Sequence, residues 1–234
     1  MDKHRMRPMP FVLDSNTDSD LKFKITESYK VVRTNIAFSL LKEGCKKIVV
    51  SSSLSGEGKT TTSVNVAISL AQMDVKVLLI DADLRKPKVN HFFNLSNTPG
   101  LTNYLGNMSD ISKMIHTTKH DNLSVICAGI TVPNPSELLA SDRMVNFLKE
   151  MEARFDYIVI DTPPLNVVVD ALPLIKLSDG VILVVREGSS TYPELNRTIK
   201  GLEMVDAKIL GFILNGSKVE QKGSYRYRYE KYGY

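Results

Sequence analysis

Six short apolar runs rich in valine and isoleucine constrain the fold of this 234-residue chain more than any other feature: KKIVVSSS, VKVLLIDAD, LSVICAG, DYIVIDTPP, GVILVV and KILGFILN. They lack the polar alternation of a strand with one face in water, so we predict strands that are buried on both faces. Helical patterns at residues 59–73, 141–154 and 191–204 supply the crossovers that parallel strands need. The sequence therefore predicts an α/β fold, a mainly parallel central sheet with helices on both faces.

The composition fits one domain with an extension at each end, since 43% of the residues are hydrophobic and 24% are charged. Residues 1–24 mix proline, aspartate, serine and asparagine without periodicity, so we predict an extended N-terminal arm. A helix is predicted next, with Thr26 as its cap and Gly44 at its end. Residues 25–217 form the predicted domain. Residues 218–234, with no aliphatic residue after Val219, form a predicted flexible tail.

The net charge of +4 is concentrated at the two ends, because residues 1–10 carry +2 and residues 218–234 carry +3. A nearly neutral body argues against a nucleic-acid-binding surface, so no nucleic-acid partner is predicted. The chain has no run of about 18 apolar residues, and its start lacks the apolar segment of a secretory signal. We therefore expect a cytoplasmic protein whose two cysteines are reduced and structural.

The first apolar run leads directly into SLSGEGKTT and then into a helical segment, which is the context of a phosphate-binding loop. Small residues let successive backbone amides point at a phosphate chain, a lysine reaches the outer phosphates, and a hydroxyl ligates magnesium. Ser53 stands where the first glycine of the motif is usual. The residues predicted to contact the nucleotide are Ser55, Gly56, Glu57, Gly58, Lys59, Thr60, Thr61 and Arg85, and a likeness to related members of the fold adds Asn215 as a contact of the adenine. For Arg85 an ion pair with an aspartate is the alternative, and for Asn215 a role in a turn.

Three aspartates follow predicted strands near this loop: Asp81 and Asp83 in DADLRKP, and Asp161 in DTPP. An isolated charge at such a place is unfavourable unless a metal or a cation compensates it. Metal ligation, the holding of a water and action as a base are the functional interpretations, and capping of the following helices is the structural alternative. We predict catalytic roles for Lys59 and the three aspartates. We predict metal ligation by Thr60, Asp81 and Asp161.

Four motifs together resemble the bacterial tyrosine kinases, the BY-kinases of capsular and exopolysaccharide synthesis. They are the Walker A loop SLSGEGKT, the additional motif VLLIDADLR, the Walker B motif IVIDTPP and a carboxy-terminal tyrosine cluster. The resemblance implies a P-loop NTPase fold of the deviant Walker A kind, ATP and Mg²⁺ as cofactors, and phosphorylation of protein tyrosines. It implies that Lys59 and Thr60 bind phosphates and magnesium, that Asp81 and Asp83 serve the metal and the acceptor, and that Asp161 holds a metal-bound water.

The segment ESYKVVRTNI resembles the glutamate–arginine helix through which these kinases assemble into ring-like homo-oligomers, with Glu27 and Arg33 at matching positions. Lys30 stands where an arginine is usual, and lysine does not make the planar two-pronged contact of arginine. The resemblance also implies a membrane-protein activator with a cytoplasmic carboxy-terminal segment, which recruits the kinase to the inner face of the plasma membrane. A cognate tyrosine phosphatase is a further implied partner.

The last ten residues, YRYRYEKYGY, hold five of the nine tyrosines: Tyr225, Tyr227, Tyr229, Tyr232 and Tyr234. A phenol titrates at about 10, so it needs a base to become a nucleophile at neutral pH. Asp81 is our first choice for that base and Asp83 our second, and a tail of +3 suits a site lined by Asp81, Asp83 and Asp161. Taken alone, the tail also fits an edge strand, a stacking platform for single-stranded nucleic acid or a basic membrane-surface patch.

Because the tail follows a phosphoryl-transfer site, we interpret its tyrosines as phospho-acceptors. The predicted function is ATP-dependent autophosphorylation between subunits, which regulates capsular and exopolysaccharide synthesis and export. The alternative is an ATPase switch with a tyrosine-rich docking tail. The chromosome-partitioning ATPases of this fold are such switches, and they carry a signature lysine in a KGGxGKT arrangement where Leu54 stands here. A leucine cannot reach a neighbour's phosphate, which favours the kinase.

Overall fold

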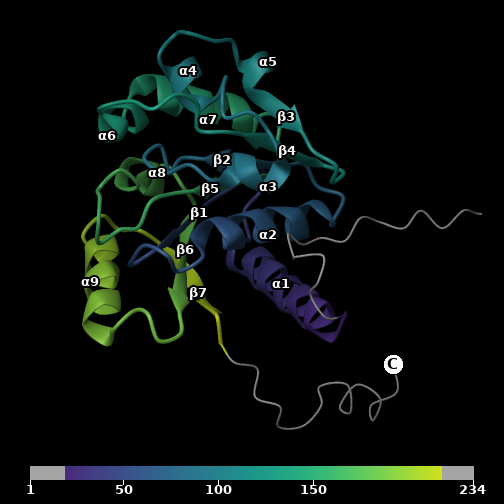
Figure 1. Ribbon diagram of the computed structural model, residues 1–234, viewed down its shortest axis with the longest axis vertical. Coiled ribbons are helices and arrows are strands. Elements are labelled where there is room, and N and C mark those ends of the chain that lie inside the picture. The colour runs from purple at the N-terminus through teal and green to yellow at the C-terminus, as the bar shows by residue number, and fades with distance from the viewer. Residues whose placement is uncertain (1–18, 218–234) are drawn as a thin grey trace, which may run out of the picture.

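The six predicted strands form one sheet in the computed structural model of the protein, which describes residues 19–217 (Figure 1). They are β1 (Lys46–Ser52), β2 (Val77–Asp81), β4 (Leu123–Ile126), β5 (Tyr157–Asp161), β6 (Gly180–Arg186) and β7 (Ile209–Asn215). The order in the sheet is β3-β4-β2-β5-β1-β6-β7, and every pair is parallel except β3 with β4. The short antiparallel edge strand β3 (Ile115–Thr117) was not predicted, because its three residues form no apolar run. The mainly parallel sheet is confirmed.

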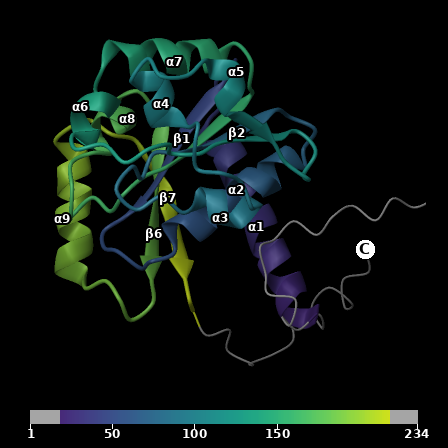
Figure 2. The same cartoon turned by 45° about the horizontal axis from the view of Figure 1, so that its top comes forward.

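Helices cover both faces of the sheet, as Figures 1 and 2 show. One face carries α1 (Ser19–Ser39), α2 (Lys59–Ala71) and α3 (Val89–Phe93). The opposite face carries α4 (Leu101–Leu105), α5 (Ile111–Met114), α6 (Pro135–Leu139), α7 (Asp142–Glu152), α8 (Leu172–Lys176) and α9 (Tyr192–Glu203). The predicted helices correspond to α2, α7 and α9. The other helices after α1 have four or five residues, too few to give a periodic pattern.

Alternate residues of each central strand point into two separate hydrophobic cores. In β1, Ile48 and Val50 pack toward α1 and α2, whereas Val49 packs toward the α4–α9 face, and all three are fully buried. The carboxyl ends of the parallel strands meet at one edge of the sheet, where ligands of open α/β folds bind. The loop after β1, the segment after β2 and the segment after β5 are thereby brought together.

Helix α1 begins earlier than the sequence analysis predicted, so residues 19–24 are helical and do not belong to an extended arm. Thr26 is not a cap, because its hydroxyl donates to the carbonyl of Lys22 (2.8 Å) inside the helix. Residues 19–25 contain neither glycine nor proline, and Asp20 lies in the first turn, where a negative charge is favourable. The helix ends at Ser39, before Gly44, whose φ of +72° makes the following turn.

The inner face of α1 packs against α2 through both apolar and polar contacts. Arg33 Nη1 donates to the carbonyl of Ser69 on α2 (3.0 Å), and Ser69 Oγ donates to the carbonyl of Tyr29 (3.2 Å). Glu27 and Lys30 form an ion pair of 2.6 Å on the outer face. The two residues matched to the self-association helix therefore lie on different sides of α1: Glu27 faces outward and Arg33 anchors the helix to its own domain. None of the helices within residues 19–217 is long and apolar enough to cross a membrane.

The contrast between Arg33 and Lys30 gives a first prediction. We expect Arg33→Met to lower the free energy of unfolding by about 1 to 2 kcal/mol, because the Ser69 carbonyl loses a charged donor. The matched change Lys30→Met removes an exposed pair and is expected to alter stability by less than about 0.5 kcal/mol. Urea unfolding followed by circular dichroism measures both values. Equal stability of the two variants would show that Arg33 does not anchor α1.

Candidate active site

The loop between β1 and α2 has the backbone of a phosphate-binding loop. Gly56 and Gly58 adopt left-handed φ angles of +84° and +93°, which side chains other than glycine rarely take. A Cβ atom on Gly58 would also overlap the side-chain amide of Asn215. Helix α2 begins at the next residue, Lys59, so its first backbone N–H groups and the positive end of its dipole lie at the loop. The loop can therefore hold the phosphates of a nucleotide.

Side chains from β6 and β7 fix this loop from behind. The fully buried Glu57 carboxylate accepts hydrogen bonds from the backbone of Leu54 (2.8 Å), the backbone of Arg186 (3.3 Å) and the hydroxyl of Ser190. Arg186 Nη1 donates to the carbonyl of Gly56 (3.2 Å), and Asn215 Nδ2 donates to the carbonyl of Glu57 (2.9 Å). The side chains of Glu57 and Asn215, which the sequence placed at the nucleotide, therefore brace the loop.

Ser53 replaces the first glycine of the loop motif because its hydroxyl has a specific partner. Thr198 on α9 donates to Ser53 Oγ (2.8 Å), and the Ser53 carbonyl accepts from the backbone of Asn166 (3.2 Å). These bonds join the loop to α9 and to the segment after β5. The replacement is thus a structural contact with no cost to the loop.

The cleft in front of the loop has a volume of about 130 Å³. It is lined by three segments: Ser55, Gly56, Lys59 and Thr60 come from the loop and the start of α2, Asp83, Arg85, Lys86 and Lys88 come from the segment after β2, and Pro163, Pro164, Val167 and Val168 come from the segment after β5. Five predicted nucleotide contacts therefore lie together: Ser55, Gly56, Lys59, Thr60 and Arg85. Gly58 shapes the turn, and Thr61 lies exposed on α2, outside the lining.

Asp161, at the end of β5, is fully buried and only half satisfied. Ser63 Oγ donates to its Oδ1 (2.8 Å), while Oδ2 is buried without a hydrogen-bond partner among the described residues. Burial raises the pKa of Asp161 to about 6, against the opposing effects of the Thr60 and Ser63 hydroxyls and the Lys59 ammonium. A buried carboxylate oxygen without a partner beside a phosphate loop is able to ligate a cation or to accept a hydrogen bond from a cation-bound water.

Asp81 has the role that the sequence analysis gave as the structural alternative. Its Oδ1 accepts from the backbone of Asp83 (3.2 Å), and its Oδ2 accepts from the backbones of Lys88 (3.0 Å) and Val89 (2.9 Å) at the start of α3. The side chain is fully buried and does not line the cleft. Burial and the carboxylate of Asp161, its register partner on β5, raise the pKa of Asp81. Both oxygens are thus occupied by backbone donors.

Asp83 is the one predicted aspartate that lines the cleft. Its Oδ1 accepts from the backbone of Lys86 (3.0 Å), and burial raises its pKa while that hydrogen bond and Lys59 oppose the rise. Of the three predicted aspartates, Asp83 alone lines the cleft directly. The cause is that Asp81 and Asp161 are the last residues of β2 and β5 and stay within the sheet, whereas Asp83 lies two residues beyond its strand.

No group of three or more histidine, cysteine, aspartate or glutamate side chains within residues 19–217 could hold a metal by itself. Magnesium does not need such a group, because it is commonly held by one or two protein oxygens together with water and substrate phosphates. The unpartnered Oδ2 of Asp161 and the hydroxyl of Thr60, at the start of α2, fit this donor set. The residues present therefore fit a magnesium ion that enters with a nucleotide.

Asp170 belongs to the site although the sequence analysis did not identify it. The Asp170 carboxylate, only 1% exposed, accepts from Arg85 Nε (2.5 Å) and Nη2 (3.1 Å) and from the hydroxyl of Ser136. Arg85 therefore pairs with an aspartate, though with none of the three predicted ones. Ser136 lies in the loop VPNPSELLAS, so the pair links three segments around the cleft.

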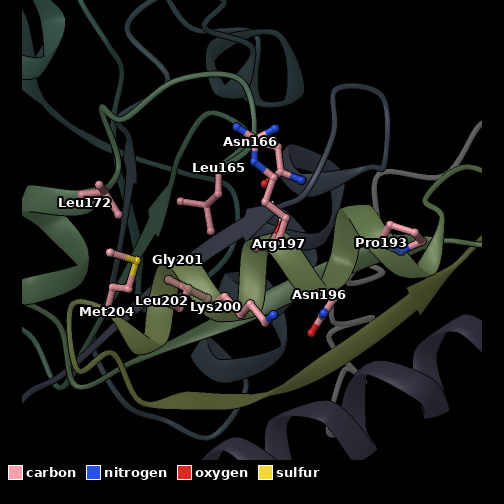
Figure 3. Close-up of a pocket in the computed structure, with 11 residues that line it drawn as sticks. Leu165, Asn166, Leu172, Pro193, Asn196, Arg197, Lys200, Gly201, Leu202 and Met204 are labelled. Atoms are coloured by element: carbon pink, nitrogen blue, oxygen red, sulfur yellow. Dashed lines mark hydrogen bonds between the residues drawn. The ribbon is translucent and has the colours of Figure 1, made fainter.

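A larger hollow of about 540 Å³ runs along α9, and none of its lining residues belongs to the phosphate-binding loop. Figure 3 shows Arg197 reaching from α9 toward Asn166, with Leu165, Leu172 and Met204 around the same space. The hollow is mixed apolar and polar in character and offers no phosphate cradle. The tail tyrosines, predicted as acceptors, lie outside the described residues, so their relation to either cavity is not defined.

Comparisons with known proteins show which family this chain resembles. The family model described as an AAA domain matches residues 45–209. Tyrosine-protein kinase YwqD from Bacillus subtilis is 39% identical over 202 residues, which are 86% of this chain and 85% of that protein. Tyrosine-protein kinase CpsD from Streptococcus agalactiae is 38% identical over 211 residues, 90% of each protein.

Solved structures give the same picture. The kinase domain of the Escherichia coli tyrosine kinase ETK has a TM-score of 0.80 and 33% identity, covering 89% of this chain and 80% of that one. The septum site-determining protein MinD from Pyrococcus horikoshii, solved with Mg-ADP, has a TM-score of 0.63 and 23% identity, covering 75% of this chain and 72% of that one. The second likeness shows a shared fold alone.

The buried Asp161 gives a prediction on stability and pH. A carboxyl whose pKa is raised in the folded protein makes the native state lose stability as pH rises from the ordinary value, about 4, to the raised value, about 6. We therefore expect Asp161→Asn to become more stable relative to the wild type across this range, by on the order of 2 kcal/mol. Thermal unfolding from pH 4 to 8 without nucleotide or magnesium measures it. A difference that shrinks with rising pH would contradict the assignment.

Proposed function

The chain belongs to the bacterial tyrosine-protein kinases, and we propose that it transfers the γ-phosphoryl group of MgATP to tyrosines of its own carboxy-terminal segment, in trans between subunits. The observation that carries the proposal is the cleft between the phosphate-binding loop and the segment after β2, with Lys59 and Thr60 on one side and Asp83 on the other. Nucleotide and acceptor can approach it from opposite walls. The segment 218–234 supplies five tyrosines.

The residues in and beside the cleft have different roles in phosphoryl transfer. The loop amides and Lys59 hold and neutralise the phosphates, which supplies most of the catalysis in reactions of this kind. Thr60 and Asp161 hold magnesium, which when bound orients the phosphates and offsets their charge. The phenol oxygen forms a bond to the γ-phosphorus as the bond from that phosphorus to the ADP oxygen breaks, and ADP leaves.

Asp83 is the better candidate for the base that accepts the phenol proton, in place of our first choice, Asp81. It lies on the cleft wall, and its raised pKa brings it closer to the range in which a carboxylate accepts a proton at neutral pH. Asp81 is engaged by three backbone N–H groups, which suits a residue that shapes the segment around Asp83. In this proposal Asp81 holds the segment that carries Asp83, and Asp83 accepts the proton of the phenol.

Transfer in trans requires self-association, and the outer face of α1 has the character of an interface. Val31 and Phe38 of α1 are exposed by 59% and 72%, and Leu41, two residues after the end of the helix, is exposed by 86%. Contiguous exposed apolar groups on a soluble protein commonly mark an interaction surface. We assign this face to the homo-oligomer, with Glu27 as a contact and Arg33 as the anchor beneath it.

The wider role follows from the family. The kinase regulates capsular and exopolysaccharide synthesis and export. A membrane-protein activator brings it to the inner face of the plasma membrane, and a tyrosine phosphatase removes the phosphates that it adds. No observation on this chain favours the ATPase switch. The two functions differ in one property: a switch hydrolyses ATP without labelling itself.

Mixing two variants tests the function and the direction of transfer. One chain carries Lys59→Met and an intact tail, and the other has a wild-type cleft and phenylalanine at all five tail tyrosines. After incubation with MgATP and the cytoplasmic segment of the activator, intact mass should show phosphates on the first chain only. Wild type should label itself, and each variant alone should stay unlabelled. ATP hydrolysis without any label would support the switch, and a labelled wild type with an unlabelled mixture would show transfer in cis.

A further inference from the structure

The wall of the cleft that faces the phosphate-binding loop is basic. Arg85, Lys86 and Lys88 line it and are exposed. Within residues 19–217, neither Lys86 nor Lys88 has an ion-pair partner. Their backbone N–H groups are bound by Asp83 and Asp81, so the segment that carries them is fixed although their side chains are not.

Arg85 is held in place on this wall. Two of its guanidinium nitrogens bind the buried Asp170, and Ser136 of α6 donates to the same carboxylate. Burial raises the pKa of Asp170, but the hydrogen bonds from Arg85 and Ser136 outweigh this effect, so the pKa of Asp170 is lowered overall. The Arg85 side chain remains 45% exposed, so it has surface left for a second anion. A planar cation fixed from behind by a carboxylate is a common way to present a binding fork to a phosphate.

The cleft lining carries basic charge besides Lys59. Arg85, Lys86 and Lys88 contribute +3, and Asp83 and the buried Asp170 behind Arg85 reduce this to +1, while Lys59 lies near the buried Asp161. Lys59 and the end of α2 already serve the nucleotide, whose complex with magnesium carries about −2. Lys86 and Lys88 lie on the other wall, and one phosphate monoester, at about −1.5 to −2, matches them.

We propose that Arg85, Lys86 and Lys88 form a second anion subsite that takes a phosphotyrosine of the acceptor segment, so that one phosphorylated tyrosine primes its neighbour. The proposal rests on the proposed function. The unmodified tail carries +3 and is repelled by a basic wall, whereas a tail with one phosphate offers it a matching group. Tyr225, Tyr227 and Tyr229 are two residues apart in the sequence, a spacing that in any extended peptide corresponds to about 7 Å with side chains on one side. The next phenol is thereby brought to Asp83 and the nucleotide.

Two peptides of residues 218–234 test this: one with phosphotyrosine at position 227, and one with Tyr227→Phe as the uncharged match. With the full-length kinase, MgATP and the activator segment, we expect kcat/KM for the phosphopeptide to be at least 10-fold higher, chiefly through KM. In the double variant Lys86→Gln/Lys88→Gln, the kcat/KM for the phosphopeptide should be less than 3-fold higher than that for the phenylalanine peptide. The KM for MgATP should change less than 3-fold. The control Lys113→Gln/Lys149→Gln removes two exposed lysines of α5 and α7 and should keep the 10-fold preference.

A binding measurement separates failure of this inference from failure of the proposed function. Anisotropy of the labelled phosphopeptide with the kinase and MgADP should show binding at least 10-fold tighter than that of the phenylalanine peptide, lost in Lys86→Gln/Lys88→Gln. If neither peptide is phosphorylated but this binding is seen, the subsite stands and the tail is no acceptor. Equal rates and equal binding of both peptides would overturn the subsite and leave the kinase function intact. A rise of 10-fold or more in the KM for MgATP with an unchanged peptide ratio would assign the wall to the nucleotide.

Discussion

The structure depends on the placement of a carboxylate at the buried end of a parallel strand. Asp161 lies in the middle of the sheet, because β5 is flanked by β1 and β2 and is covered by α2. One of its oxygens is satisfied by Ser63 and the other is not. Ionising such a group without a cation is unfavourable, so the fold carries an unfavourable free energy that binding can relieve. The packing of the sheet stabilises the fold against this unfavourable free energy. The position of Asp161 next to Lys59 places its unpartnered oxygen beside the phosphate-binding loop.

The rest of the site is arranged so that few groups reach the cleft directly. Glu57, Asn215 and Arg186 fix the loop from behind, Asp81 fixes the segment before α3, and Asp170 fixes Arg85. Each of these polar groups is paired with a backbone group or an oppositely charged side chain, as the buried carboxylates of Glu57, Asp81 and Asp170 require. Rigid positioning suits phosphoryl transfer, in which orientation and charge neutralisation contribute more than covalent chemistry. The cleft thus combines a phosphate side with a basic wall, and a single carboxylate lies on that wall.

The parts of this arrangement that could be predicted are those in which sequence neighbours decide the outcome. The strands follow from their apolar runs, and the loop follows from its glycines and its place between β1 and α2. The roles of Glu57 and Asp170 could not be predicted, because most of their partners are set by the tertiary fold. Arg85 and Asp170 are 85 residues apart, and Glu57 and Arg186 are 129 apart. The start of α1 was missed for a different reason, since a polar segment with good helix formers shows little apolar periodicity.

The central claim is that Asp161 keeps one buried oxygen for the magnesium of a nucleotide. Calorimetric titration of ADP into the wild type and Asp161→Asn, each with and without Mg²⁺, tests it most directly. The claim predicts that Mg²⁺ tightens ADP binding by at least about 10-fold in the wild type, a difference of about 1.4 kcal/mol. In the variant, ADP should bind equally well with and without the ion. An undiminished effect of Mg²⁺ in Asp161→Asn would contradict the claim.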